Sequence, residues 1–139
     1  MFSQTVEYAL RAVVHLAQHA PAPQKTSDIA QATQVPQAYL VKVLQGLSGK
    51  DIVRLQRGVG GGVSLARDTH QLTILDVVNA VDPFQRINSC PLDLKSHGTN
   101  LCALHRRMDN ALLAMEDAFR TTTLAELLED PNPCIPLKG

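Results

Sequence analysis

The chain has 139 residues, 13 basic and 13 acidic side chains, and a hydrophobic content of 45%. This length fits one ordinary domain that buries its own core without disulfide bonds. No apolar run is long enough to span a bilayer, and the first residues lack the pattern of a signal peptide. We therefore expect a cytoplasmic protein with no membrane partner, whose three cysteines are free to act as ligands or sensors.

The charged side chains are unevenly distributed along the chain. Residues 1–70 carry seven basic and four acidic side chains, whereas residues 71–139 carry six basic and nine acidic ones. A cationic N-terminal half is consistent with a polyanionic partner on that side of the protein. Solvated surface charge is the alternative explanation, and the counts alone do not separate the two.

Three helices are predicted before residue 50. The first carries apolar residues at helical spacing and ends before Pro21. Thr26 or Ser27 is the expected N-cap of a short second helix with Asp28 in its first turn. Pro36 opens a third helix that ends near Gly49. Its apolar face is formed by Tyr39, Leu40, Val43, Leu44 and Leu47. The short polar turn between the second and third helices predicts a helix-turn-helix.

The period changes from helical to alternating in the segment DIVRLQRGVGGGVSLAR, residues 51–67. Two short strands flank the glycine run Gly58–Gly62, which predicts a β-hairpin. The run is not a Walker A loop because no Lys-Ser/Thr pair follows it, and it is not a dinucleotide fingerprint because a strand follows it. A helix-turn-helix followed by a hairpin with Arg54 and Arg57 at its base predicts a winged helix.

Helices return in the second half of the chain. Thr73 is the expected cap of a helix that Pro83 stops, and residues 84–99 are predicted to form a loop. A long amphipathic helix is expected from Asn100, and Thr123 with Glu126 gives a capping box for a last short helix. The apolar stripe of the long helix comprises Leu101, Leu104, Met108, Ala111, Leu112, Met115 and Phe119. This stripe predicts a two-fold dimer, with an intramolecular core helix as the alternative.

The winged helix suggests which side chains contact double-stranded DNA. Gln37, at the start of the third helix, suits a base edge, while Tyr39 and Lys42 suit the backbone. Arg54 and Arg57 place cations on the wing, and Gly58 lets the wing backbone approach the DNA closely. Thr26 and Ser27 are expected to be helix caps first and phosphate contacts second. The alternative interpretation makes Tyr39 a core residue and Gln37 a solvated one.

The segment SCPLDLKSHGTNLCALHRR, residues 89–107, gathers Cys90, His97, Cys102 and His105. These residues are metal ligands, a redox pair, or small residues of a loop and a helix. Cys102 and His105 are three positions apart and therefore share one face of the predicted long helix. Cys134 lies in the proline-rich tail and is interpreted as an incidental thiol. The segment has no CxxC motif and the chain no recognisable Ser/His/Asp arrangement, so an enzyme is not expected.

Four segments resemble the Rrf-two (BadM-type) family of transcription regulators. They are VEYALRAVVHLAQ, TSDIAQATQVPQAYLVKVLQGLSGKDIVRLQRGVGGGVSLAR, LTILDVVNAVD and the late Cys/His region. The resemblance covers residues 1 to about 128, and the wing RGVGGGVSLAR is its most specific part. It implies a mainly α fold, with a winged helix-turn-helix, a two-stranded wing and a long dimerisation helix. The corresponding parts are a DNA-binding domain (1–82), a sensor loop (83–99), the dimerisation and last short helices (100–130) and a flexible tail (131–139).

The resemblance also implies an iron–sulfur cluster in the sensor loop. Relatives with a cluster hold three cysteines there, and Ser96 stands where the middle cysteine belongs, between Cys90 and Cys102. His105 matches a histidine ligand of relatives, and Glu7 occupies a position from which relatives lend a carboxylate across the dimer. His97 is a further candidate ligand. Mixed thiolate, imidazole and carboxylate ligation favours a [2Fe–2S] over a [4Fe–4S] cluster.

The expected function is a homodimeric DNA-binding regulator that represses transcription from a palindromic operator. Its sensor is expected to be the cluster, responding to redox, iron or nitrosative state. The alternative is a family member without a cluster, which senses thiol oxidation or a small-molecule effector. In that case Cys102 is a small core residue, His105 a solvated one, and Glu7 a carboxylate favourable to the dipole of its own helix.

Overall fold

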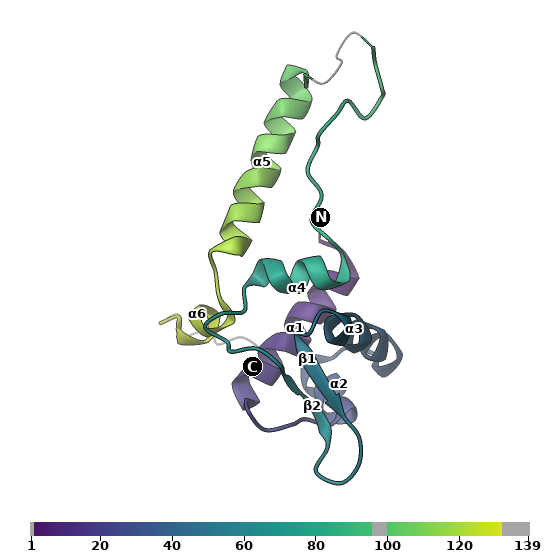
Figure 1. Ribbon diagram of the computed structural model, residues 1–139, viewed down its shortest axis with the longest axis vertical. Helices are drawn as coiled ribbons and strands as arrows, with labels where there is room; N and C mark the ends of the chain where they lie inside the picture. The colour runs from purple at the N-terminus through teal and green to yellow at the C-terminus, as the bar shows by residue number, and fades with distance from the viewer. Residues whose placement is uncertain (1, 96–99, 132–139) are drawn as a thin grey trace.

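The computed structural model describes residues 2–95 and 100–131, and shows a mainly helical protein with one small sheet (Figure 1). The helices are α1 (Gln4–His19), α2 (Thr26–Thr33), α3 (Gln37–Gly49), α4 (Ile74–Val81), α5 (Ala103–Arg120) and α6 (Leu124–Glu129). The strands are β1 (Val53–Gln56) and β2 (Gly62–Leu65). These elements confirm the predicted winged helix-turn-helix with a long helix attached to it.

The core lies between α1, the helix-turn-helix and the base of the wing. α1 packs against α2, α3 and α4, so it runs through the centre of the domain. Its small Ala9 and Ala12 and the larger Val13 and Leu16 are almost fully buried. Alternating small and large residues let the helices approach closely, which is how a chain with only 4% aromatic residues fills its core.

The predicted caps of α4 and α6 hold, and the predicted cap of α2 is wrong. Thr73 caps α4 by accepting from the Asp76 amide, while the Asp76 carboxylate accepts from the Thr73 amide, which completes a capping box. Thr123 caps α6 by accepting from the Glu126 amide, and its hydroxyl donates to the Glu126 carboxylate over 3.3 Å, without the reciprocal amide bond of the predicted capping box. The N-cap of α2, however, is Lys25, with no side-chain cap bond, so Thr26 is already the first helical residue.

The wing is an antiparallel hairpin in which Arg54 faces Ser64 and Gln56 faces Gly62. Strand β2 is joined to the turn before α2 by two backbone bonds between Gln24 and Val63, of 2.8 and 2.7 Å. Three wing glycines, Gly58, Gly60 and Gly62, have positive φ, a conformation that residues with a Cβ avoid. The wing is therefore attached to the helical domain at one end and free at its tip.

α5 extends away from the winged helix and contacts mainly α4 (Figure 1). It begins at Ala103 with Cys102 as its N-cap, three residues later than expected from the sequence, because Cys102 has an extended backbone. None of its 18 residues is buried in the single chain. Within the described residues, no helix is both long and apolar enough to cross a membrane.

α6 fastens the far end of α5 to the winged helix. Leu72 and Leu124 are both fully buried, and the Leu124 amide donates to the Leu72 carbonyl over 2.9 Å. The Ile74 amide donates to Thr122 and the Ala125 amide to Thr69, each over 3.0 Å. The chain thus returns after α5 to form part of the core of the winged helix, so α5 is held at its C-terminal end.

Candidate nucleic-acid interface and sensor loop

α3 presents one polar face to solvent, as a recognition helix requires. Leu40, Val43, Leu44 and Leu47 are buried, whereas Gln37, Tyr39 and Lys42 are exposed. Tyr39 is 55% exposed, so the interpretation of this residue as part of the core is wrong. The helix buries its i, i+3, i+4 and i+7 positions and leaves its opposite face available.

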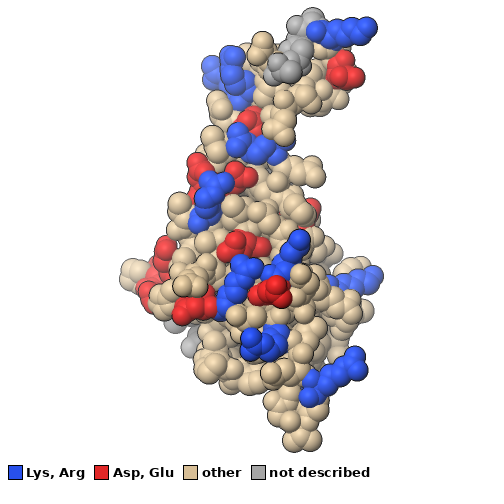
Figure 2. Space-filling model, in the orientation of Figure 1, with Lys and Arg blue, Asp and Glu red and all other residues tan. Residues whose placement is uncertain are grey.

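Several cations around α3 and the wing have no carboxylate partner. Lys42, Arg54 and Arg57 are exposed and make no ion pair within the described residues. Arg11, Arg67, Arg86 and Arg120, by contrast, each pair with a carboxylate. Figure 2 shows that the charged side chains nearest the wing-bearing end of this face are basic. Unpaired cations attract an external polyanion more strongly than cations neutralised within the chain.

The start of α2 and the tip of the wing border a common open hollow of about 730 Å³. Lys25 and Asp28 line it on the helix side, and Gly58–Gly61 line it on the wing side. Thr26, which is half-buried, and Ser27, which is exposed, lie between these two helix residues in the chain, at the positive end of the α2 dipole, but do not themselves line the hollow. Backbone amides at a helix start and in a glycine-rich loop donate hydrogen bonds to phosphate oxygens.

The predicted cluster ligands are only partly brought together. Cys102 Sγ lies 3.3 Å from His105 Nδ1, although Cys102 is the extended N-cap of α5 and not, as predicted, part of its helical face. Cys90 is buried in a turn closed by the Asp93 amide on the Cys90 carbonyl. Glu7 pairs with Arg11 over 3.0 Å on α1. Within residues 2–95 and 100–131 no three His, Cys, Asp or Glu side chains are grouped closely enough to hold a metal. Ser96, His97 and Cys134 lie outside the described residues.

An ion pair that the sequence did not indicate ties the loop after α4 to α5. Arg86 Nε and Nη2 donate to the two carboxylate oxygens of Asp109 over 2.8 and 2.7 Å, and the Ile87 amide donates to Asp109 over 2.9 Å. Arg86 also lies 3.8 Å from Glu116. The hydrogen bonds from Arg86 hold the pKa of Asp109 below its ordinary value. We call this group of residues, Arg86, Ile87 and Asp109, the loop clasp.

Replacing Asp109 with asparagine should loosen the loop from α5. The amide removes the charge that the guanidinium binds in bidentate fashion. Because the folded pKa of Asp109 is lowered, the clasp stabilises the protein above the unfolded pKa of about 4 and is lost as pH falls through the folded value. Limited proteolysis of residues 83–95 should be several-fold faster in Asp109→Asn at pH 7, with Asp117→Asn as control. Equal cleavage rates in the two variants would contradict the clasp.

Comparison of the sequence with known proteins identifies a family that matches almost the whole chain. The sequence profile of the Rrf2 family, described as an iron-dependent transcriptional regulator, matches residues 2–130. A protein from Aquifex aeolicus that carries the name of an HTH-type transcriptional regulator is 30% identical, covering 92% of this chain and 91% of its own. A similarly named protein from Mycobacterium tuberculosis is 33% identical over 90% of this chain and 79% of its own.

Solved structures share the fold. IscR from T. potens superposes with a TM-score of 0.77 at 22% identity, covering 95% of this chain and 88% of that one. CymR, the global cysteine regulator of B. subtilis, superposes with a TM-score of 0.78 at 22% identity, covering 95% of this chain and 98% of that one. Identities this low show a common fold and not a common ligand. With the family profile and the winged helix in agreement, the chain belongs to the Rrf2 family of transcriptional regulators.

Proposed function

We propose that this protein is a homodimeric DNA-binding regulator of the cytoplasm, not an enzyme, and that it represses transcription from a palindromic operator. The observation that carries the DNA-binding part is the set of exposed, unpaired cations beside α3 and on the wing: Lys42, Arg54 and Arg57. Such cations displace counterions from DNA when they contact phosphates, which drives binding.

Each exposed residue of the interface has a role that its position suits. Gln37 lies at the N-terminal end of α3, where a recognition helix reads bases, and its amide suits adenine. Tyr39 and Lys42 would contact the sugar-phosphate backbone beside the groove. Arg54, Arg57 and Gly58 would bring the wing onto the adjacent minor groove or backbone. Thr26 and Ser27 would contact phosphate at the start of α2.

The dimer is proposed from the exposure of α5. Leu104 is 63% exposed and Met108 47%, on an 18-residue helix with no buried residue in the single chain. Apolar side chains spaced along one helix face are buried most simply against the same face of a second copy. Two-fold symmetry would then present two α3 helices to two half-sites.

Arg57→Ala should weaken binding to duplex DNA and lower the dependence on salt. Each lost phosphate contact reduces the slope of log K against log[salt] by about one. Arg120→Ala is the matched control, because it removes the same charge at the C-terminal end of α5, where Arg120 pairs with Glu116 and Asp117. Fluorescence anisotropy over a range of salt concentrations measures both. Binding that does not depend on salt would contradict phosphate-dominated contacts.

We propose further that a [2Fe–2S] cluster is held by Cys90, Cys102 and His105, with Glu7 of a second copy as the remaining ligand. The donor types fit, since thiolates and imidazole ligate such clusters. Cys102 and His105 already lie side by side. Cys90 would have to reach them from its turn, and Glu7 would have to leave Arg11. A bound cluster would supply redox sensitivity next to the start of α5, and the loop clasp joins that region to the rest of the helix.

Metal analysis of protein purified without oxygen tests the cluster. We expect about two irons and two acid-labile sulfides per chain and visible absorption. Single Ala variants of Cys90, Cys102, His105 and Glu7 should each lower the iron content, while His70→Ala should not. An iron-free protein that still binds DNA would reject the cluster and favour the alternative of thiol oxidation or a small-molecule effector.

A further inference from the structure

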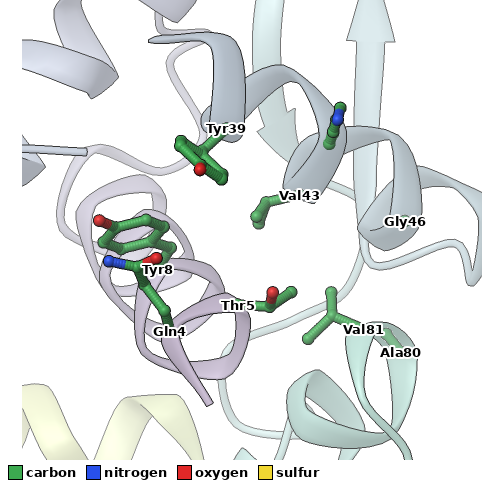
Figure 3. A pocket seen from close by; sticks show the side chains of 9 residues that line it. Gln4, Thr5, Tyr8, Tyr39, Val43, Gly46, Ala80 and Val81 are labelled. Atoms are coloured by element: carbon green, nitrogen blue, oxygen red, sulfur yellow. The ribbon is translucent and has the colours of Figure 1, made fainter. Parts of the chain in front are cut away.

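A small cavity opens between α1, α3 and α4 (Figure 3). One of these helices, α3, also carries the proposed base contact. Its volume is about 270 Å³. In Figure 3, Tyr8 and Thr5 of α1, Tyr39 and Val43 of α3, and Val81 of α4 surround the space. The cavity does not overlap the sensor loop, and the proposed DNA and cluster functions leave its lining unexplained.

The lining combines an apolar floor with one basic side chain. Val43, Gly46 and Val81 provide aliphatic surface, while the rings of Tyr8 and Tyr39 meet edge to face with centroids 6.1 Å apart. Lys42 is the one charged residue of the described lining, and no carboxylate of the described chain neutralises it. No acidic side chain belongs to the described lining. The cavity therefore favours a guest with an apolar body and an anionic head.

We propose that this cavity binds a small organic acid, a monocarboxylate with a short apolar chain, and that binding lowers the affinity for DNA; the second part rests on the proposed function. The apolar chain lies against Val43 and Val81, and the carboxylate lies at Lys42. At about 270 Å³ the cavity is slightly smaller than the pockets of about 300–1,000 Å³ that hold drug-sized ligands, so it suits a smaller acid.

The link to DNA follows from the residues that the two sites share. Tyr39 and Lys42 line the cavity and are also among the proposed backbone contacts. A carboxylate bound to the Lys42 ammonium competes with a DNA phosphate for the same charge. Because such coupling is reciprocal, DNA must lower the affinity for the acid by the same factor as the acid lowers the affinity for DNA.

Intrinsic fluorescence reports on this cavity alone. The chain has two tyrosines and no tryptophan, and both tyrosines line the cavity. Hexanoate is a suitable probe because it does not absorb where tyrosine does, and hexanamide is the neutral control of equal length. A ligand of about eight non-hydrogen atoms binds in the millimolar range at ordinary ligand efficiencies. We expect hexanoate to change the tyrosine emission with a dissociation constant of about 1 mM.

Two glycines of α3 provide matched variants that spare the tyrosines and lysine. A Cβ on Gly46 would meet Val81 Cγ1 at 3.5 Å, an ordinary contact, so Gly46→Met can place its side chain into the cavity without a backbone clash. A Cβ on Gly49 would meet nothing within 4 Å, and Gly49 is not part of the lining, so Gly49→Met is the control. Gly46→Met should weaken hexanoate binding at least about tenfold, and Gly49→Met should leave it unchanged.

Three results would overturn this inference. The first is that hexanoate, at concentrations well above the expected dissociation constant of about 1 mM, causes no saturable change in fluorescence. The second is that hexanamide binds as tightly as hexanoate. The third is that the two methionine variants bind hexanoate equally. These titrations use the full-length protein without DNA, so their failure is separate from any failure of DNA binding. If the acid binds and DNA binding is confirmed, saturating hexanoate must weaken the DNA complex several-fold; an unchanged DNA affinity would overturn the coupling.

Discussion

Truncating Leu124 to alanine should destabilise the protein by about 2–5 kcal/mol, because its fully buried side chain leaves a cavity that the core cannot refill. Leu124 packs in the DNA domain, and its backbone amide is bonded to Leu72. Loss of this contact frees α6, and with it the C-terminal end of α5. Denaturation with urea should show the loss of stability, and hydrogen exchange should show early opening of α6.

Leu92→Ala is the control for this experiment. It deletes the same atoms at a side chain that is 72% exposed, so it should change the free energy of unfolding by less than about 0.5 kcal/mol. If Leu124→Ala were as stable as Leu92→Ala, α6 would not be part of the folded core in solution, and the described attachment of α5 would be wrong.

Replacing Gly62 with alanine should displace the wing and weaken DNA binding by about tenfold or more. Gly62 has φ +146°, and a Cβ at this position would lie 2.8 Å from the Gln24 carbonyl oxygen. That carbonyl accepts from the Val63 amide, so the new methyl group collides with the bond that fixes the wing to the domain. The backbone strain adds roughly 1–3 kcal/mol.

Gly60→Ala separates the collision from the strain. Gly60 also has a positive φ, +78°, but a Cβ there would meet nothing within 4 Å. It should therefore cost only the conformational strain at the wing tip and retain most of the DNA affinity. Circular dichroism and DNA anisotropy of the two variants measure stability and binding in parallel. Equal losses in both would show that the bond between Gln24 and Val63 does not position the wing.

Much of the fold follows from local sequence patterns. The helical period places α1, α3 and α4, and the change to an alternating period around the glycine run places the wing. The threonine caps of α4 and α6 follow from residues within one turn of each other. The error at α2 has a local cause as well: with Lys25 in the cap position, the hydroxyl of Thr26 lies one residue too late to cap the helix.

The features that the sequence did not predict join distant segments. Arg86 and Asp109 are 23 positions apart, and no local pattern distinguishes this pair from the other charged residues. The contact between Leu72 and Leu124 depends on the chain returning to the DNA domain after α5. The cavity beside α3 is likewise formed by three helices, so neither its shape nor the proximity of Tyr8 and Tyr39 could be read from periodicity.

The candidate sites also combine features that local sequence predicts with features that depend on distant segments. Cys102 and His105 lie close together, as predicted, but not on a shared helix face: Cys102 is the extended N-cap of α5 and His105 lies in its first turn. The exposure of Gln37 and Lys42 follows from the burial of the opposite face of α3. The proposed cluster ligation cannot be read from a single chain, because Cys90 lies on a different segment and Glu7 would come from a second copy.

The central claim is that this protein binds DNA sequence-specifically as a dimer. Selection from a library of random-sequence duplexes tests it most directly. The full-length protein, prepared without oxygen, is incubated with the library at moderate salt, and the bound duplexes are amplified and sequenced. We predict enrichment of a two-fold symmetric sequence whose half-sites are centred about one helical turn, roughly 10 base pairs, apart. Enrichment of no sequence, or equal affinity for the enriched duplex and its scrambled counterpart, would contradict the account.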